Sequence, residues 1–191
     1  TTLAGYPSTS GAPFSTVMIN GAPLYGAGQT SYMDTATLFR MDDTISGVEV
    51  VQGGTGVLYG PGQIGATANF LLRTGTDVPS GDVGVTYGSE GMGRVDGFVG
   101  FPVAKNWYGS VGGFYRSSDG IRDTQYKSDE GGQLTATLKH IGERSSLLLW
   151  GRVLSDKNMF LKQVPIIQGP DGDFHAYPGF DPLTGIYNGR A

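Results

Sequence analysis

The chain has 191 residues with a formal net charge of −4 at pH 7, 33 glycines and no cysteine. The lack of cysteine excludes disulfides and thiolate metal sites, and the acidic balance gives no electrostatic reason to expect nucleic-acid binding. Glycine is about twice as frequent as usual without a three-residue repeat, which excludes collagen, and 11% aromatic residues argue against a disordered tail.

Membrane-targeting segments are also missing from the sequence. It has no run of about 18 apolar residues, so it predicts no membrane-spanning helix. It has no basic and then apolar N-terminal signal segment either. A secreted or outer-membrane protein loses that segment on maturation, so its absence excludes no compartment.

The N-terminal part of the chain is dominated by glycine, proline, serine and threonine. Within it, Val17–Ile19 followed by Asn20–Gly21 predicts a strand that enters a tight turn. Met33–Asp43 is the best helical candidate, because Met33, Thr37, Leu38 and Met41 recur at helical spacing. We expect this short helix to need packing against the rest of the protein to hold it.

A second glycine-rich segment, Gly47–Thr76, begins with a short apolar strand at Val48–Val51. Glycine at this density within strands and turns predicts tight bends and close approach of the backbone, because no side chain would fit there. From Ile45 onward the sequence predicts no helix.

From Asp82 the sequence alternates with a period of two, which predicts five strands. Each predicted strand has one apolar face, and most have a polar face. The clearest is Gln133–Ile141, in which Leu134, Ala136 and Leu138 alternate with polar residues. The other four are Asp82–Gly88, Met92–Phe101, Trp107–Ser117 and Leu147–Leu154.

The connections between these strands differ in length. Pro102–Asn106 and Gly142–Ser145 are short, Ser118–Gly131 is long and polar, and the chain after Ser155 is expected to be long and irregular. Outer-membrane barrels combine short periplasmic turns with longer extracellular loops, and this pattern favours such a barrel. The short link at Ser89–Gly91 is the exception.

A soluble β-sandwich also alternates, so the period alone leaves it open. The polar faces here carry glycine, serine and threonine more than the charged residues expected on a water-exposed sheet, which favours the barrel. Charge on a lipid face costs roughly 2–4 kcal/mol near the bilayer midplane, so the charged strand residues should face the lumen. These residues are Arg94, Asp96, Arg116 and Arg152.

Four segments resemble the plug domain of TonB-dependent outer-membrane receptors. Phe14–Pro23, with the sequence FSTVMINGAP, is similar to the plug strand that ends in an aspartate-glycine turn, with Asn20 where aspartate is usual. Gly47–Gly56 resembles the strand and turn that follow it. Leu58–Gly60 resembles the leucine-tyrosine-glycine turn, and Gly65–Thr74 the last plug strand. The hairpins from Asp82 resemble the start of the family's barrel.

The sequence also departs from the family's pattern in two places. Ala4 stands where the family has the arginine of an arginine-glycine-phenylalanine motif, and Gln52 stands where arginine or lysine is common. Glu49 therefore either lacks a partner that helps to fix plug to barrel or finds that partner on the barrel wall.

The resemblance implies a mainly β fold in two parts. Residues 1–78 would form a partial plug domain of mixed β structure with a short helix, and residues 79–191 the first five antiparallel strands and loops of a transmembrane β-barrel. A barrel that holds a plug has about 22 strands. Five unclosed strands in lipid would leave backbone groups unpaired. We therefore expect the chain to be a fragment of a longer or split receptor.

The resemblance further implies an active transporter, not an enzyme, in the outer membrane of a Gram-negative bacterium. Such a protein binds and imports a scarce nutrient, commonly a ferric siderophore, and needs no cofactor. The expected partners are the TonB–ExbB–ExbD energy-transducing complex, outer-membrane lipid, the rest of the same receptor and a small-molecule ligand, with no nucleic acid. We expect the box that TonB contacts to be absent from this chain.

Two other functions stay open. One is a surface adhesion or interaction module, built as a self-standing β-sandwich with long binding loops. The other is a passive porin, in which Gly47–Thr76 would line the wall and not fill the pore.

The predicted ligand-binding residues lie on plug loops that, by the resemblance, point toward arriving ligand, and at the outer rim of the barrel. They are Tyr6, Tyr25, Gln29, Tyr32 and Arg116. Aromatic faces with hydrogen-bonding tips suit a bulky, partly apolar chelate or glycan, although the same residues would also serve to pack plug against wall. The predicted plug turns and plug–barrel contacts are Glu49, Gly53, Tyr59, Gly60, Gly65, Asn69, Arg94, Asp96 and Arg152.

Other chemistry finds little support. The glycines from Gly53 to Gly60 lack the following helix and the lysine of a phosphate loop. Asp171, Asp173 and His175 lack the remaining ligands of a calcium loop, which favours an ordinary solvated loop, and His140 at a strand end favours a girdle or lumen position. The sequence contains no serine nucleophile elbow. It therefore predicts neither an enzyme nor a metal site.

Overall fold

The computed structural model describes residues 15–24, 40–52, 66–121, 126–159 and 166–181. All regular structure within these ranges is β, and they contain no helix. Most of the predicted helix at Met33–Asp43 lies outside the described residues, and its described end, residues 40–43, is not helical. None of the described residues forms a helix with the length and apolar character needed to cross a bilayer.

The chain divides into two units. One contains residues 1–83, 96–114 and 133–154, and the other contains residues 84–95, 115–132 and 155–191.

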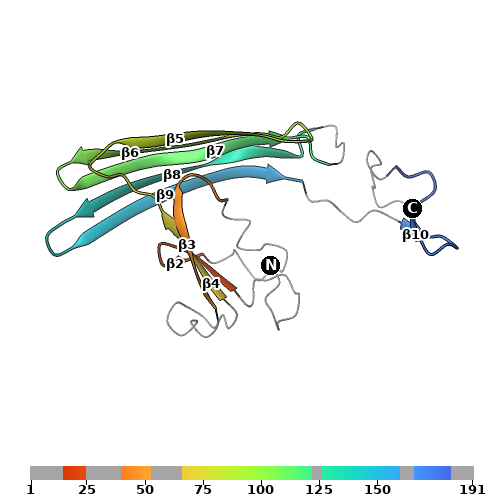
Figure 1. The fold of residues 1–191 in the computed structure, drawn as a ribbon, viewed down its shortest axis with the longest axis horizontal. Helices are drawn as coiled ribbons and strands as arrows, with labels where there is room; N and C mark the ends of the chain where they lie inside the picture. Colours follow the sequence, from red (N-terminus) through yellow and green to blue (C-terminus); the bar gives the residue numbers. More distant parts are fainter. Residues whose placement is uncertain (1–14, 25–39, 53–65, 122–125, 160–165, 182–191) are drawn as a thin grey trace. The chain divides into compact units, whose positions relative to one another are not determined.

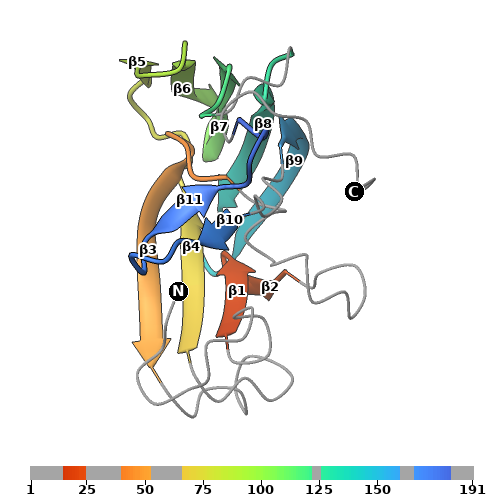
Figure 2. The same ribbon diagram turned by 90° about the vertical axis from the view of Figure 1, so that its right-hand side faces the viewer.

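A four-stranded sheet in the first unit has the order β2-β1-β4-β3 (Figure 2). Its strands are β1 (Ser15–Ile19), β2 (Ala22–Pro23), β3 (Ile45–Gln52) and β4 (Ala66–Leu72). β1 runs parallel to β4, and the pairs β1–β2 and β3–β4 are antiparallel. The strand at Val17–Ile19 and the apolar strand at Val48–Val51 are both confirmed.

The turn between β1 and β2 is the tight turn that the sequence predicts. Asn20 and Gly21 both have positive φ angles, 47° and 79°. These values belong to the left-handed region, which glycine and asparagine enter most easily and which a two-residue hairpin turn requires. The Asn20 side chain also accepts a hydrogen bond from the Leu72 backbone N–H at 3.0 Å, which ties the turn to β4.

The small apolar core of this unit lies where β1 and β4 pair. Ile19 and Leu72 are buried, and partly buried apolar side chains surround them. These are Leu24, Ile45, Phe70 and Trp150. Trp150 belongs to β9, so one residue of the second sheet completes the core of the first.

The second sheet has five strands in chain order, β5 to β9, each hydrogen-bonded to its neighbours in the chain (Figure 1). They are β5 (Ser80–Tyr87), β6 (Gly93–Ala104), β7 (Trp107–Ser118), β8 (Asp129–Ile141) and β9 (Ser146–Asn158). All five predicted strands are confirmed, and several extend beyond their predicted ends. β8 begins four residues before its predicted start at Gln133. Asp129–Gly132 belong to the strand, but their two acidic residues and two glycines show no apolar–polar alternation.

The sheet is open within the described residues, with β5 and β9 at its edges. The segment after Ser155, expected to be irregular, is partly ordered as strand. β9 continues to Asn158, and β10 (Ile166–Gln168) pairs with β11 (Phe174–Ala176) in a short antiparallel hairpin. The expectation is wrong here because Gly172, with φ of 85°, allows a hairpin turn.

Candidate functional site

One face of the five-stranded sheet is buried and mostly polar, apart from Phe98, Tyr108 and Phe114, and the other face exposes apolar side chains. In β8, Gln133 and Thr135 are 3% and 1% exposed, while Leu134 between them is 57% exposed. The same order holds in β7, where Ser110 is buried and Val111 is exposed, and Val153 is exposed in β9. A sheet in water normally presents the opposite arrangement. The polar face is covered in part by the chain between β2 and β5.

Gln133 holds one segment of that chain. Its side-chain Oε1 accepts a hydrogen bond from the Arg40 backbone N–H at 3.2 Å, and its Nε2 donates to the Arg40 carbonyl at 2.9 Å. The same Nε2 donates to Asp42 Oδ2 at 2.6 Å. A primary amide can pair with both polar groups of one residue's backbone, as a neighbouring strand would. Residues 40–42 are therefore fixed to β8 by a side chain.

Asp42 and Thr44 shape the turn that leads into β3. Asp42 Oδ1 accepts hydrogen bonds from the Thr44 backbone N–H at 2.9 Å and from the Thr44 hydroxyl. This is the side-chain-to-backbone pairing that aspartate commonly makes two residues along in turns. Thr44 is buried against β7, where its Cγ2 would lie 2.8 Å from a Cβ added at Gly112. Only glycine at position 112 allows this close approach.

Arg152 lies on the polar face of β9, as predicted. Its Nε donates to the Thr135 hydroxyl at 2.9 Å. The guanidinium group is partly buried and interacts electrostatically with the Asp42 carboxylate. Asp42 therefore meets both an amide donor and a positive charge on the sheet.

A second segment, residues 73–77, runs along β7. The Arg73 carbonyl accepts from the Ser110 hydroxyl at 3.2 Å, and Ser110 is paired with Thr137 at 2.6 Å. The Tyr108 hydroxyl donates to Asp77 at 2.9 Å. A Cβ on Gly75 would lie 2.2 Å from the Gly109 carbonyl oxygen, so this segment lies directly on the sheet backbone.

The Arg73 side chain is also held on three sides. Its Nη2 forms an ion pair with Asp82 at 2.7 Å, and its Nη1 donates to the Asp43 carbonyl at 3.2 Å. Its guanidinium carbon lies 3.8 Å from the ring centre of Phe98, a cation–π geometry. Arg73 was not among the predicted site residues; its place between β4 and β5 was the available signal.

Two predicted residues of the first sheet meet each other. Asn69 Nδ2 donates to Glu49 Oε2 at 2.9 Å, and Asn69 Oδ1 accepts from the Gly21 backbone N–H at 2.8 Å. Asn69 therefore ties the β1–β2 turn to β3. Glu49 has this amide as a partner within its own sheet.

In the second unit, Arg116 joins three strands. Its Nε and Nη2 donate to Asp156 at 3.1 and 2.9 Å, a bidentate pair, and it also contacts Asn158 and Asp129. The Asp156 side chain is fully buried, and a quarter of the Arg116 side chain is exposed. A guanidinium fork matched to a carboxylate is a rigid arrangement. Arg116 is engaged with its neighbours in this structure, and its role in ligand binding stays a prediction.

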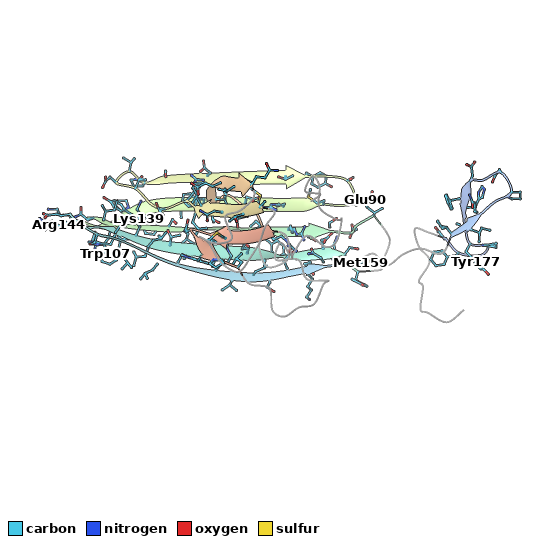
Figure 3. All side chains as sticks on the ribbon, turned by 90° about the horizontal axis from the view of Figure 1, so that it is seen from below. Glu90, Trp107, Lys139, Arg144, Met159 and Tyr177 are labelled. Carbon is cyan, nitrogen blue, oxygen red and sulfur yellow. The ribbon has the colours of Figure 1, made fainter. Side chains whose placement is uncertain are left out.

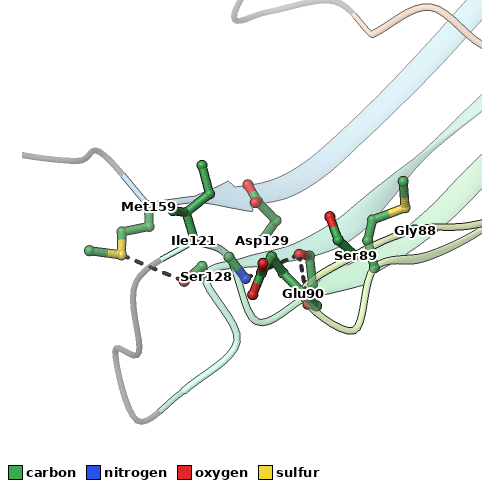
Figure 4. A pocket seen from close by; sticks show the side chains of 10 residues that line it. Gly88, Ser89, Glu90, Ile121, Ser128, Asp129 and Met159 are labelled. Atoms are coloured by element: carbon green, nitrogen blue, oxygen red, sulfur yellow. Dashed lines mark hydrogen bonds between the residues drawn. The ribbon is translucent and has the colours of Figure 1, made fainter. Parts of the chain in front are cut away.

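A cavity of about 330 Å³ lies at the strand ends of the second unit (Figure 4). Glu90 and Asp129 give it two carboxylates, and Met92 and Met159 give it two thioethers. Ser128 borders it, with its hydroxyl 3.6 Å from the Met159 sulfur. Polar groups beside soft apolar surface can hold a partly apolar small molecule. Alternation along strands carries no information about the connections between them, so the sequence did not predict this cavity.

The remaining predicted residues divide into two groups. Asp96 is buried and Arg94 is partly buried in β6. The others lie outside the described residues: Tyr6, Tyr25, Gln29, Tyr32, Gly53, Tyr59, Gly60 and Gly65. Their predicted roles stay predictions.

The described residues contain no group of three or more histidines and carboxylates placed to hold a metal ion. His175 and Asp171 lie 3.3 Å apart in the β10–β11 hairpin, and both are exposed.

Comparison with known proteins identifies the N-terminal region. Residues 2–67 match the family model of the TonB-dependent receptor plug domain. No curated protein matches the sequence of the chain.

Solved structures share the fold. The pyoverdine receptor FpvA of Pseudomonas aeruginosa aligns with a TM-score of 0.60 and 24% identity over 72% of this chain and 20% of its own. The ferric preacinetobactin receptor BauA of Acinetobacter baumannii aligns with a TM-score of 0.56 and 23% identity over 72% of this chain and 20% of its own. The siderophore receptor PirA of P. aeruginosa gives 0.58 and 14%, over 75% of this chain and 26% of its own.

The chain thus spans a fifth to a quarter of the length of these receptors. At such identities the likeness shows the fold alone. Residues 2–67 of this chain thus match the plug domain of TonB-dependent receptors.

Proposed function

We propose that this chain is part of an outer-membrane active transporter that imports a scarce nutrient with energy delivered through TonB. One observation carries the proposal: β5 to β9 expose an apolar face, while a plug-region segment is hydrogen-bonded to their polar face through Gln133. A wall between lipid and a plugged lumen needs this polarity.

The proposed roles differ between the N-terminal and C-terminal parts of the chain. Residues 1–78 act as the plug region, and residues 79–191 supply five strands and their loops to the wall. The open edges at β5 and β9 support a larger barrel, of about 22 strands when it holds a plug, because lipid offers no hydrogen bonds to an unpaired strand. The remaining strands then belong to the same receptor.

The proposed nutrient is a ferric siderophore. Two of the structures that share the fold are described as receptors for ferric preacinetobactin and pyoverdine. The cavity beside Met92 and Met159 offers hydroxyl, carboxylate and thioether groups at strand ends. These groups and Arg116, which lies in the same unit, would contact a bulky, partly apolar chelate. Tyr6, Tyr25, Gln29 and Tyr32 are proposed as ligand contacts by the resemblance of their loops to those of the plug.

The proposed partners follow from the family. The TonB–ExbB–ExbD complex of a Gram-negative cell would deliver the work that moves the plug region, and the surrounding partner is outer-membrane lipid. Binding and transport would be separate steps, because the plug closes the pore until it is displaced. No chemical step on the ligand is proposed.

Uptake by the receptor that carries this sequence tests the proposal. Cells that express it should accumulate radiolabelled ferric siderophore only when TonB and the proton gradient are intact. Deletion of residues 1–78 should replace this by passive leakage of small solutes. Energy-independent uptake by the intact receptor would contradict the proposal and support a passive pore.

A further inference from the structure

One end of the five-stranded sheet gathers positive charge. The turn at Lys105–Asn106 and the turn that contains Arg144 lie side by side, since the Ile141 backbone N–H donates to the Asn106 carbonyl at 3.0 Å. Figure 3 labels Arg144 near Trp107, the first residue of β7. We call Lys105 and Arg144 the turn-end cations. Lys139 also precedes the second turn, but it shares the polar face of β8 with Gln133 and Thr135 and is not one of them.

The turn-end cations are not neutralised by their surroundings. Neither Lys105 nor Arg144 forms an ion pair with another described residue. Glu143 is the one carboxylate within their two turns. Asp77 and Asp82 are engaged elsewhere: Asp77 accepts a hydrogen bond from Tyr108, and Asp82 is paired with Arg73. A net positive group therefore remains at this end of the sheet.

An aromatic pair lies at the same strand ends. The rings of Trp107 and His140 are 4.6 Å apart between centroids and tilted by 40°. By the period of two, Trp107 shares a face of β7 with Val111, and His140 shares a face of β8 with Leu134, and both of those apolar residues are exposed. The pair therefore marks the border where the apolar face ends. Tryptophan at such a border is typical of the level of lipid headgroups.

The apolar face continues from this border along the strands. Phe101, Val103, Leu147 and Leu149 are all exposed large hydrophobic residues. Along the strands of the first unit, the apolar surface is thus followed by the aromatic pair and then by the turn-end cations. The connections that alternate with these turns along the chain instead carry Glu90 and Asp119, and their Lys127 is paired with Asp119.

We propose that the turn-end cations bind the phosphate of an anionic phospholipid, with phosphatidylglycerol as the ligand that fits. The acyl chains would lie on the apolar face and the glycerol region beside Trp107 and His140. The occupant is anionic and not zwitterionic because the cations outnumber Glu143, and basic residues beside a bilayer attract anionic headgroups. This inference rests on the proposed membrane location of β5 to β9.

The test reconstitutes the purified receptor in nanodiscs that contain both lipids. Native mass spectrometry then measures which lipids stay bound to the receptor released from them. The wild-type receptor should retain phosphatidylglycerol over phosphatidylcholine. Lys105→Gln combined with Arg144→Gln should reduce that retention on the order of tenfold. Lys127→Gln combined with Lys157→Gln removes the same charge elsewhere and should leave retention unchanged.

Two results would overturn the lipid proposal alone. One is equal retention of both lipids by a wild-type receptor that enters phosphatidylcholine nanodiscs normally. The other is displacement of phosphatidylglycerol by millimolar inorganic phosphate, which would assign the cations to a soluble anion. Failure of the receptor to enter any nanodisc would instead contradict the membrane location on which the proposed function depends.

Discussion

The Gln133 carboxamide is hydrogen-bonded to both the N–H and the carbonyl of Arg40, 93 residues away in the chain. The Gln133 side chain thus satisfies the backbone N–H and carbonyl of one plug-region residue, as a neighbouring strand would. A strand pair would have to break many bonds at once. A few side-chain bonds separate more easily, which suits a segment that leaves the sheet during the transport proposed above.

Replacing Gln133 by alanine should loosen the plug region. The change removes three hydrogen bonds and leaves the Arg40 backbone and the Asp42 carboxylate without this partner, at about 1–3 kcal/mol for each buried group left unsatisfied. We expect a lower Tm for the detergent-solubilised receptor and faster proteolysis near residues 40–52.

Leu134→Ala is the matched control in the same strand. Leu134 points to the exposed face, so the control should leave proteolysis of residues 40–52 at the wild-type rate. Equal effects of the two variants would show that Gln133 acts through the strand and not through Arg40.

A methyl group at position 112 should disturb the contact with Thr44. A Cβ at Gly112 would lie 2.7 Å from the Gly97 carbonyl oxygen and 2.8 Å from Thr44 Cγ2, so the plug segment or the strand must shift. Gly112→Ala should lower the free energy of unfolding by about 1–3 kcal/mol, the usual cost of overpacking. Gly151→Ala meets no described atom within 4 Å and should be near neutral in the same urea titration.

Charge on the apolar face should be costly in a depth-dependent way. Leu134 lies in the middle of β8 and Leu147 at the start of β9, and both are exposed. In lipid, Leu134→Arg should cost roughly 2–4 kcal/mol and Leu147→Arg about 0–1 kcal/mol. Folding into phospholipid vesicles at increasing urea measures both values. Similar small effects for the two variants would favour a sheet that faces water.

Loss of the Arg116 guanidinium should destabilise the second unit. Asp156 is fully buried beside it, and breaking a buried ion pair from one side costs about 3–5 kcal/mol. Arg116→Gln should therefore lower the urea midpoint strongly, and adding Asp156→Asn should restore part of the loss. No recovery in the double variant would mean that Arg116 acts mainly through Asn158 and Asp129.

The sequence predicted the strands and their polarity because both follow from a period of two. Leu134 on one face and Thr135 on the other are visible in the sequence alone, and the Asn20–Gly21 turn has its own local signature. The hydrogen bonds between the Gln133 side chain and the Arg40 backbone have no such signature. A side chain that bonds to a distant backbone leaves the period-two pattern of the sequence unchanged. The cavity near Met92 and the β10–β11 hairpin were missed for the same reason: both depend on connections.

Position-specific accessibility of β8 tests the central claim most directly, because the sequence has no cysteine to interfere with labelling. Spin labels at Leu134→Cys and Thr135→Cys in the reconstituted receptor would be probed with oxygen, which enters lipid, and with a water-soluble nickel chelate. The account predicts that the Leu134 position is open to oxygen and closed to the chelate, and that the Thr135 position is shielded from both. A Leu134 label that collides freely with the chelate would contradict it.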